Sequence, residues 1–236
     1  MAKNLLIVES PAKAKTINRY LGDDFEVLAS YGHVRDLPSR DGAVDTENGY
    51  AMHYELSDGS KKHVDKIIKA TRKADAVYLA TDLDREGEAI SWHIYEILKE
   101  KKLTRNTPFY RVEFSEITKR AILEAVANPR ELSMDLVNAQ QARRALDHLV
   151  GFTLSPLLWK KIKPGLSAGR VQSPALRMIV EREREIEAFN AREYWTIEAQ
   201  LQQSGHAFTA NLVFLDGDKY RQFDIQDEKR ATAVRN

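Results

Sequence analysis

The chain has 236 residues, of which 43% are hydrophobic and 30% charged, a balance typical of a globular protein with a substantial core. It contains no cysteine and no apolar run of about 18 residues, which excludes disulfides, a thiolate zinc site and a transmembrane helix and favours the cytoplasm. The net charge is only +1, so the chain as a whole does not indicate a polyanionic partner.

The first half of the chain alternates β-rich runs with amphipathic segments. Asn4–Val8 is apolar, and the Ser10-Pro11 pair after it is typical of a helix start, with serine as N-cap and proline in the first turn. This alternation predicts βαβ units and a mostly parallel sheet, with residues 36–55 as an excursion from it. The expected strands are residues 4–8, 26–31, 76–80 and 109–114; the expected helices are 11–21, 86–101 and 117–127, with a further helix face at Val64, Ile67, Ile68 and Thr71.

The character of the sequence changes after Pro129. A helix is expected over residues 133–150, then a basic loop, then a helix from Ser173 to about Glu187. Residues 194–201 and 207–215 resemble an antiparallel pair, and the polar tail has neither a helix stop nor a closing strand, so we expect the chain to be truncated. The predicted parts are an α/β domain over residues 1–130, a helical domain over 131–188 and the start of an incomplete β-rich domain over 189–236.

Four acidic residues are expected at the carboxyl ends of two neighbouring strands, where α/β sheets bind ligands. Asp82, Asp84 and Glu86 follow the third strand, and Glu9 follows the first. Carboxylates placed so close repel one another unless a cation lies among them, and Mg²⁺ is the cation that prefers oxygen ligands. The alternative is a solvated turn whose acids stabilise the start of a helix.

Basic residues near this edge suit a phosphate group. Lys13 lies in the first turn of the helix beside Glu9, where free backbone amides also favour anions. Lys15 is more simply a solvated residue, which is the alternative for Lys13 as well. His33 follows the second strand, and a lone histidine is more often structural than functional.

Residues 140–177 contain seven basic side chains and one acid, a local charge of +6 that is typical of a nucleic-acid surface. Arg143 and Asp147 are four residues apart and so share one helix face, which fits either a plain surface ion pair or an arginine fork that reads a base or phosphate. Phe152 and Trp159 offer flat surfaces for unpaired bases, or simply pack in a core. The glycine-bearing loop of residues 165–173 suits a phosphate backbone, or is an ordinary loop.

Four segments together resemble the type IA DNA topoisomerases, in the order of that family and across the whole chain. The Val-Glu-Ser-Pro-Ala-Lys form of the first segment is similar to that of bacterial DNA topoisomerase I. The segments are Leu6-Ile-Val-Glu9-Ser-Pro-Ala-Lys13-Ala-Lys-Thr-Ile, Ala80-Thr-Asp82-Leu-Asp84-Arg-Glu86-Gly-Glu-Ala-Ile, Asn138-Ala-Gln-Gln-Ala-Arg143-Arg144 and Leu166-Ser-Ala-Gly-Arg170-Val-Gln172-Ser.

The resemblance implies a Toprim domain, a helical DNA-binding domain and the beginning of a β-rich gate. It implies that Glu9, Asp82, Asp84 and Glu86 bind Mg²⁺, with Glu9, Asp84 and Glu86 catalytic, and that Lys13 positions the scissile phosphate. The DNA contacts that it implies are His33, Arg143, Arg144, Asp147, Phe152, Trp159, Ser167, Ala168, Gly169, Arg170, Val171 and Gln172. A tyrosine can stand in place of Phe152, so a hydroxyl contact would be lost there while stacking survives.

The activity implied by the resemblance is ATP-independent, Mg²⁺-dependent relaxation of negatively supercoiled DNA. One strand would be cut, the other passed through, and the break rejoined through a 5′-phosphotyrosine. The family's Tyr-x-Arg-Thr-Asp-Ser nucleophile motif is absent from these 236 residues, so we expect no cleavage by this chain alone. We expect a monomer that prefers single-stranded DNA and binds no membrane. The alternatives are another Toprim enzyme (a primase or nuclease) and a non-enzymatic single-strand-binding module.

Overall fold

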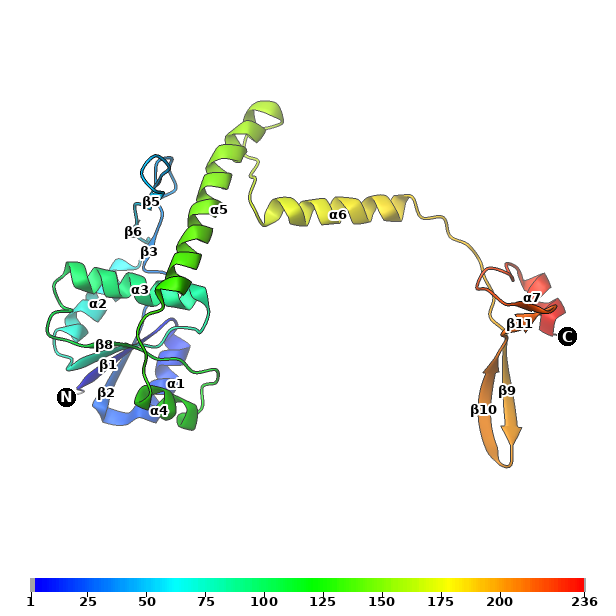
Figure 1. Ribbon diagram of the computed structural model, residues 1–236, viewed down its shortest axis with the longest axis horizontal. Coiled ribbons are helices and arrows are strands. Elements are labelled where there is room, and N and C mark those ends of the chain that lie inside the picture. The colour runs from blue at the N-terminus through cyan, green and yellow to red at the C-terminus, as the bar shows by residue number, and fades with distance from the viewer. Residues whose placement is uncertain (1–2, 236) are drawn as a thin grey trace. The chain divides into compact units, whose positions relative to one another are not determined.

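The computed structural model describes residues 3–235, which divide into two compact units (Figure 1). The first unit runs to Ser173 and the second begins at Pro174. None of the helices within residues 3–235 is long and apolar enough to cross a membrane.

A four-stranded parallel sheet forms the centre of the first unit, which confirms the α/β prediction (Figure 1). Its strands lie in the order β2, β1, β7 and β8, so that β1 and β7, which precede the acidic residues, are neighbours. The bounds are β1 (Asn4–Val8), β2 (Phe25–Ala29), β7 (Ala76–Leu79) and β8 (Phe109–Arg111). Three of these strands, β2, β7 and β8, are shorter than expected. β2 ends at Ala29, just before Tyr31, whose φ of 65° is left-handed and incompatible with a strand.

Helices cover both faces of this sheet, as the apolar run in β1 requires. Leu5 and Ile7 point to one face, in a core shared with helices α2 and α3. Leu6 and Val8 point to the other face, in a core shared with α1 and α4. The bounds are α1 (Pro11–Leu21), α2 (Lys61–Thr71), α3 (Arg85–Glu100) and α4 (Lys119–Ala127), with a short 3₁₀ turn, η1, over Gly22–Asp24.

The helix starts follow from local sequence. The Ser10 side chain accepts a hydrogen bond from the backbone N–H of Lys13 at 3.4 Å, and Asp84 and Thr118 cap α3 and α4 in the same way. The excursion over residues 36–55 forms part of two small antiparallel pairs. It packs against Ala145 and Leu149 of the long helix α5 (Met134–Lys161). These strands are β3 (Arg35–Asp36), β4 (Val44–Asp45), β5 (Ala51–Met52) and β6 (Glu55–Leu56).

Helix α5 (Met134–Lys161) is longer than the sequence predicted. The predicted end at Val150 is wrong, because the helix continues through Gly151 and Pro156 and takes in the first part of the expected basic loop. The good helix formers Leu157, Leu158 and Lys160 follow Pro156, which removes only one backbone donor from the ladder. Phe152 and Trp159 therefore lie on a helix rather than in a loop.

The second unit contains most of α6 (Gln172–Glu187), two hairpins and a last helix. The antiparallel pair was predicted, although its strands are β9 (Glu198–Gln203) and β10 (His206–Asn211), shifted from the predicted ranges. A second pair, β11 (Phe214–Leu215) with β12 (Asp218–Lys219), and the helix α7 (Glu228–Arg235) were not predicted.

Candidate active site and nucleic-acid interface

Glu9 and Asp82 lie beside each other at the carboxyl edge of the sheet and share one cation. The ammonium of Lys13 lies 3.2 Å from the Glu9 carboxylate and also pairs with Asp82. The backbone N–H of Asp82 donates to Glu9, which ties the ends of β1 and β7 together. Lys13 reaches both acids because Ser10 starts α1 directly after Glu9.

The two carboxyl groups have pKa values shifted in opposite directions. Burial raises the pKa of Glu9, and the neighbouring side-chain carboxyl group of Asp82 raises it further. The interaction of its side chain with that of Glu9 lowers the pKa of Asp82, with help from Lys13. Glu9 is therefore the member of the pair that keeps a proton to higher pH, while Asp82 remains ionised.

The other two acids of the DxDxE segment have separate partners. The Asp84 carboxylate accepts from the backbone N–H of Gly87 at 2.9 Å and so caps α3. Glu86 accepts from the Gln140 amide at 3.2 Å and lies 3.6 Å from the His33 ring. A side chain at Gly87 would place its Cβ 2.2 Å from the Asp82 carbonyl oxygen, so the close turn requires glycine.

These four acids do not form a closed cluster. Within residues 3–235, no group of three histidine, aspartate or glutamate side chains is arranged to hold a metal ion. Their chemistry nevertheless fits Mg²⁺, since the donors are carboxylates and the side chains of Asp82 and Glu86 are substantially exposed. Lys13 supplies the positive charge between Glu9 and Asp82.

A buried arginine that sequence analysis missed holds the backbone of the turn that carries Asp82. Arg111, at the end of β8, donates to the backbone carbonyl of Asp82 at 2.6 Å and to that of Thr81 at 2.8 Å. Its charge is balanced by Glu88, whose side chain is 0% exposed and lies 2.8 Å away. Glu88 stands in the recognised second segment, but nothing in the sequence links it to Arg111.

Glu88 also joins the sheet to the start of α5. It accepts two hydrogen bonds from Arg130 at 2.8 Å and one from the backbone N–H of Ser133, the N-cap of α5, at 2.6 Å. Burial alone would raise its pKa, but the hydrogen bonds from Arg130, Arg111 and Ser133 outweigh burial and lower the pKa to about 2.

A polar cavity of about 270 Å³ lies between Glu86 and α5. His33, Glu86, Gln140 and Arg144 are among its lining residues. The Gln140 side-chain oxygen is buried and has no hydrogen-bond partner within the described part of the chain. Such an acceptor is costly unless a donor from water or a ligand reaches it.

The arginines predicted to contact DNA are held by carboxylates. Arg170 donates to Asp147 at 2.7 Å, and Arg143 lies 3.8 Å from the same carboxylate. Arg144 instead makes a two-pronged contact with Asp36 at 2.6 and 2.8 Å. Asp36 was missed, because its partner is 108 residues away in sequence.

Both predicted stacking residues are accessible on α5. Phe152 is 37% exposed and stacks on His148 with ring centroids 4.3 Å apart. Trp159 is 47% exposed, and its indole N–H donates to the carbonyl of Leu166 at 2.5 Å. The alternative in which these aromatics pack in a core is therefore not what the structure has.

The loop after α5 is fixed by side chains as well as by backbone turns. Ser155 accepts from the backbone N–H of Ala168 at 3.1 Å, and the Gln172 amide donates to Ser167 at 3.0 Å. The Gly169 N–H donates to Ser173 at 3.3 Å, while Val171 is exposed. The predicted loop residues 167–172 thus lie next to the end of α5.

Comparison with known proteins agrees with this arrangement. Residues 4–117 match the family described as Toprim domain, and residues 131–236 match the family described as DNA topoisomerase. A DNA topoisomerase 1 from Xylella fastidiosa is 65% identical over 99% of this chain and 29% of its own length. One from Rickettsia typhi is 60% identical over 96% of this chain and 29% of its own length.

A solved structure of full-length topoisomerase I from Thermotoga maritima superposes with a TM-score of 0.76 at 39% identity. The match covers 98% of this chain and 37% of that one. The chain thus spans about 29% of the length of the curated relatives named here. With two adjoining family matches and this degree of identity, the chain belongs to the type IA DNA topoisomerases of the bacterial topoisomerase I kind.

Proposed function

We propose that this chain supplies the acidic site and part of the DNA-binding surface of an enzyme that relaxes negatively supercoiled DNA. The enzyme would act in the cytoplasm as a monomer, without ATP, by cutting one strand, passing the other and rejoining the break through a 5′-phosphotyrosine. The observation that carries the proposal is Lys13, held between Glu9 and Asp82 at the carboxyl edge of a parallel sheet.

Lys13 would place a phosphodiester beside a carboxyl group that can give up a proton. Its ammonium can bind a phosphate oxygen, helped by the positive end of the α1 helix dipole. When a tyrosine attacks the phosphorus, the bond to the 3′ oxygen breaks and that oxygen needs a proton. Glu9, whose pKa is raised by burial, is the group placed to deliver it.

Asp82, Asp84 and Glu86 would hold Mg²⁺. When bound, the ion would supply positive charge for phosphate oxygens during rejoining. To hold the ion, Asp82 would give up part of its contact with Lys13, and Asp84 would use the carboxylate oxygen that does not cap α3. The buried oxygen of Gln140 would accept a hydrogen bond from a nucleotide placed next to Glu86.

The bound strand would follow α5 toward Trp159. Phe152 and Trp159 can stack on unpaired bases, whereas paired bases have no free face. Arg143, Arg144 and Arg170 would exchange their contacts with Asp147 and Asp36 for contacts with DNA phosphates or base edges. Salt-dependent preference for single strands is the expected consequence.

This preference can be measured with the chain itself. Fluorescence anisotropy with a labelled single-stranded oligonucleotide and the matching duplex, over a series of salt concentrations, gives both affinities and their salt slopes. We expect tighter binding of the single strand at every salt concentration. Duplex binding of equal affinity would contradict the proposal.

A further inference from the structure

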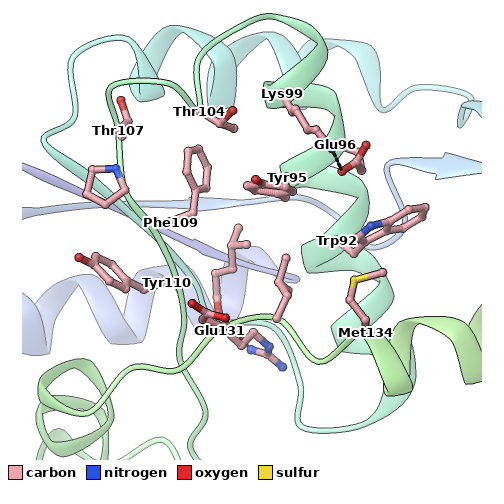
Figure 2. Close-up of a pocket in the computed structure, with 14 residues that line it drawn as sticks. Trp92, Tyr95, Glu96, Lys99, Thr104, Thr107, Phe109, Tyr110, Glu131 and Met134 are labelled. Atoms are coloured by element: carbon pink, nitrogen blue, oxygen red, sulfur yellow. Dashed lines mark hydrogen bonds and ion pairs between the residues drawn. The ribbon is translucent and has the colours of Figure 1, made fainter.

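A second cavity lies away from the acidic edge, beside the outer strand β8, and the proposed function makes no use of it. It has a volume of about 560 Å³ and lies between α3, the loop before β8 and the first turn of α5 (Figure 2). Four of the side chains that line it are aromatic: Trp92, Tyr95, Phe109 and Tyr110. The Tyr95 and Phe109 rings meet edge to face, with centroids 5.4 Å apart.

One part of this cavity already holds an ammonium group. The Lys99 side chain lies 3.0 Å from the Glu96 carboxylate, and its nitrogen is 5.9 Å from the centre of the Tyr95 ring. A carboxylate and an aromatic face are the two features by which proteins bind organic cations. The contacts of Lys99 with Glu96 and Tyr95 therefore show that this wall of the cavity can bind a positively charged group.

A second carboxylate at the cavity lacks such a partner. Figure 2 shows Glu131 well away from Lys99 and Glu96, with the Tyr95 and Phe109 rings between them. Glu131 is exposed, and no cation from residues 3–235 pairs with its carboxylate. Arg111, the other basic residue of the lining, is occupied by Glu88 and by backbone carbonyls.

We propose that this cavity binds a small organic cation that carries a flat aromatic group. The ammonium would pair with Glu131, and the ring would lie against Tyr95 and Phe109. Met134, at the first turn of α5 and 47% exposed, would contact the ring from the side. The site is independent of the proposed DNA chemistry, because none of the residues that bind the cation belongs to the acidic edge or the α5 arginines.

Three naphthalene probes of nearly equal size test the charge preference: naphthalen-2-ylmethylammonium, naphthalen-2-ylmethanol and 2-naphthoate. With ¹³C-methyl-labelled methionine, the Met134 signal reports on the cavity and those of Met52 and Met178 report on other regions. We expect the ammonium probe to shift the Met134 signal and to bind about two- to fivefold more tightly than the alcohol. Equal binding of the two, or tighter binding of 2-naphthoate, would overturn the proposal.

Two pairs of variants locate the contact. Glu131→Gln should weaken ammonium binding by about two- to fivefold, while Glu124→Gln, which removes an exposed charge from α4, should not. Tyr95→Leu should weaken binding, and Tyr95→Phe, which keeps the ring, should preserve it. An unchanged dissociation constant in Glu131→Gln would refute the assignment even if Tyr95→Leu failed to fold.

Discussion

At the scale of single residues, the two carboxyl groups around Lys13 differ in their readiness to ionise. Glu9 is partly buried and keeps its proton to higher pH, whereas Asp82 is stabilised as an anion. The sequence places both at strand ends, but only the structure brings Lys13 between them. That contact depends on the pairing of β1 with β7, which places Asp82 beside Glu9. The residue spacing within the two sequence segments does not predict this pairing.

Loss of the exposed acids should reduce affinity for Mg²⁺. In Asp82→Asn/Asp84→Asn, two of the carboxylates that favour the ion become neutral amides, while asparagine can still cap α3. Isothermal titration of Mg²⁺ into the chain should give weaker binding for the double variant than for Asp23→Asn/Asp24→Asn, two acids in the turn η1. Equal affinities of the wild-type chain and the double variant would rule out this site.

The ionised form of Glu88 should stabilise the fold in a pH-dependent way. Because its pKa is lowered to about 2 in the folded chain, its contribution is complete above the unfolded pKa of about 4.5 and disappears as the pH falls toward 2. The shift corresponds to about 3 kcal/mol. His93, whose pKa is lowered to about 3 by burial and by Arg35, should add to the loss of stability in acid, since it must charge on unfolding.

Glu88→Gln isolates that contribution. The variant leaves Arg111 buried with only the more distant Glu113 carboxylate, 4.0 Å away, as an anionic partner, and should lose about 3–5 kcal/mol at neutral pH. Urea unfolding between pH 2.5 and 7 should show a weaker pH dependence than the wild type. Glu113→Gln, which removes a partly exposed contact with Arg130 and only the longer, 4.0 Å contact with Arg111, is the matched control and should lose far less. A pH profile of Glu88→Gln parallel to that of the wild type would contradict this role.

At the scale of secondary structure, the α/β order could be predicted because local signals coincide. Apolar runs specify the strands, and Ser10, Asp84, Thr118 and Ser133 cap the helices that follow. The end of α5 could not be predicted, since Gly151 and Pro156 are ordinary stop signals that the helix overrides. Asp36 and Arg111 were missed because their partners come from distant segments.

Arg143 and Arg170, near the end of the first unit, should contact different parts of the DNA: a base in one case and a backbone phosphate in the other. Arg143→Ala should weaken single-strand binding and, if the arginine reads a base, reduce any sequence preference. Arg170→Ala should weaken all sequences alike and lower the salt slope by about one, as for one lost phosphate contact. Anisotropy titrations with two oligonucleotides of different sequence distinguish these effects, with Lys69→Ala on α2 as control. An unchanged salt slope in Arg170→Ala would mean that Arg170 only anchors Asp147.

At the scale of the whole molecule, the chain joins an acidic edge to a basic helix without a recognisable nucleophile. Its nine tyrosines include none in a Tyr-x-Arg-Thr-Asp-Ser sequence. A phenol with an ordinary pKa near 10 needs a neighbouring cation or base to attack a phosphate at neutral pH. Tyr31 follows strand β2, close to His33, but it does not serve as a nucleophile here: its ring is exposed and stacks on His63.

The most direct test of the proposed function is covalent capture of DNA. The full-length gene product and residues 1–236 are each incubated with 5′-end- and 3′-end-labelled single-stranded DNA, quenched with denaturant and resolved by electrophoresis. We predict a protein–DNA band carrying the 3′ label from the full-length product, reduced by Glu9→Gln, and no band from residues 1–236. A band from residues 1–236 that disappears on mutation of one of its tyrosines, or no band from the full-length product, would contradict the account.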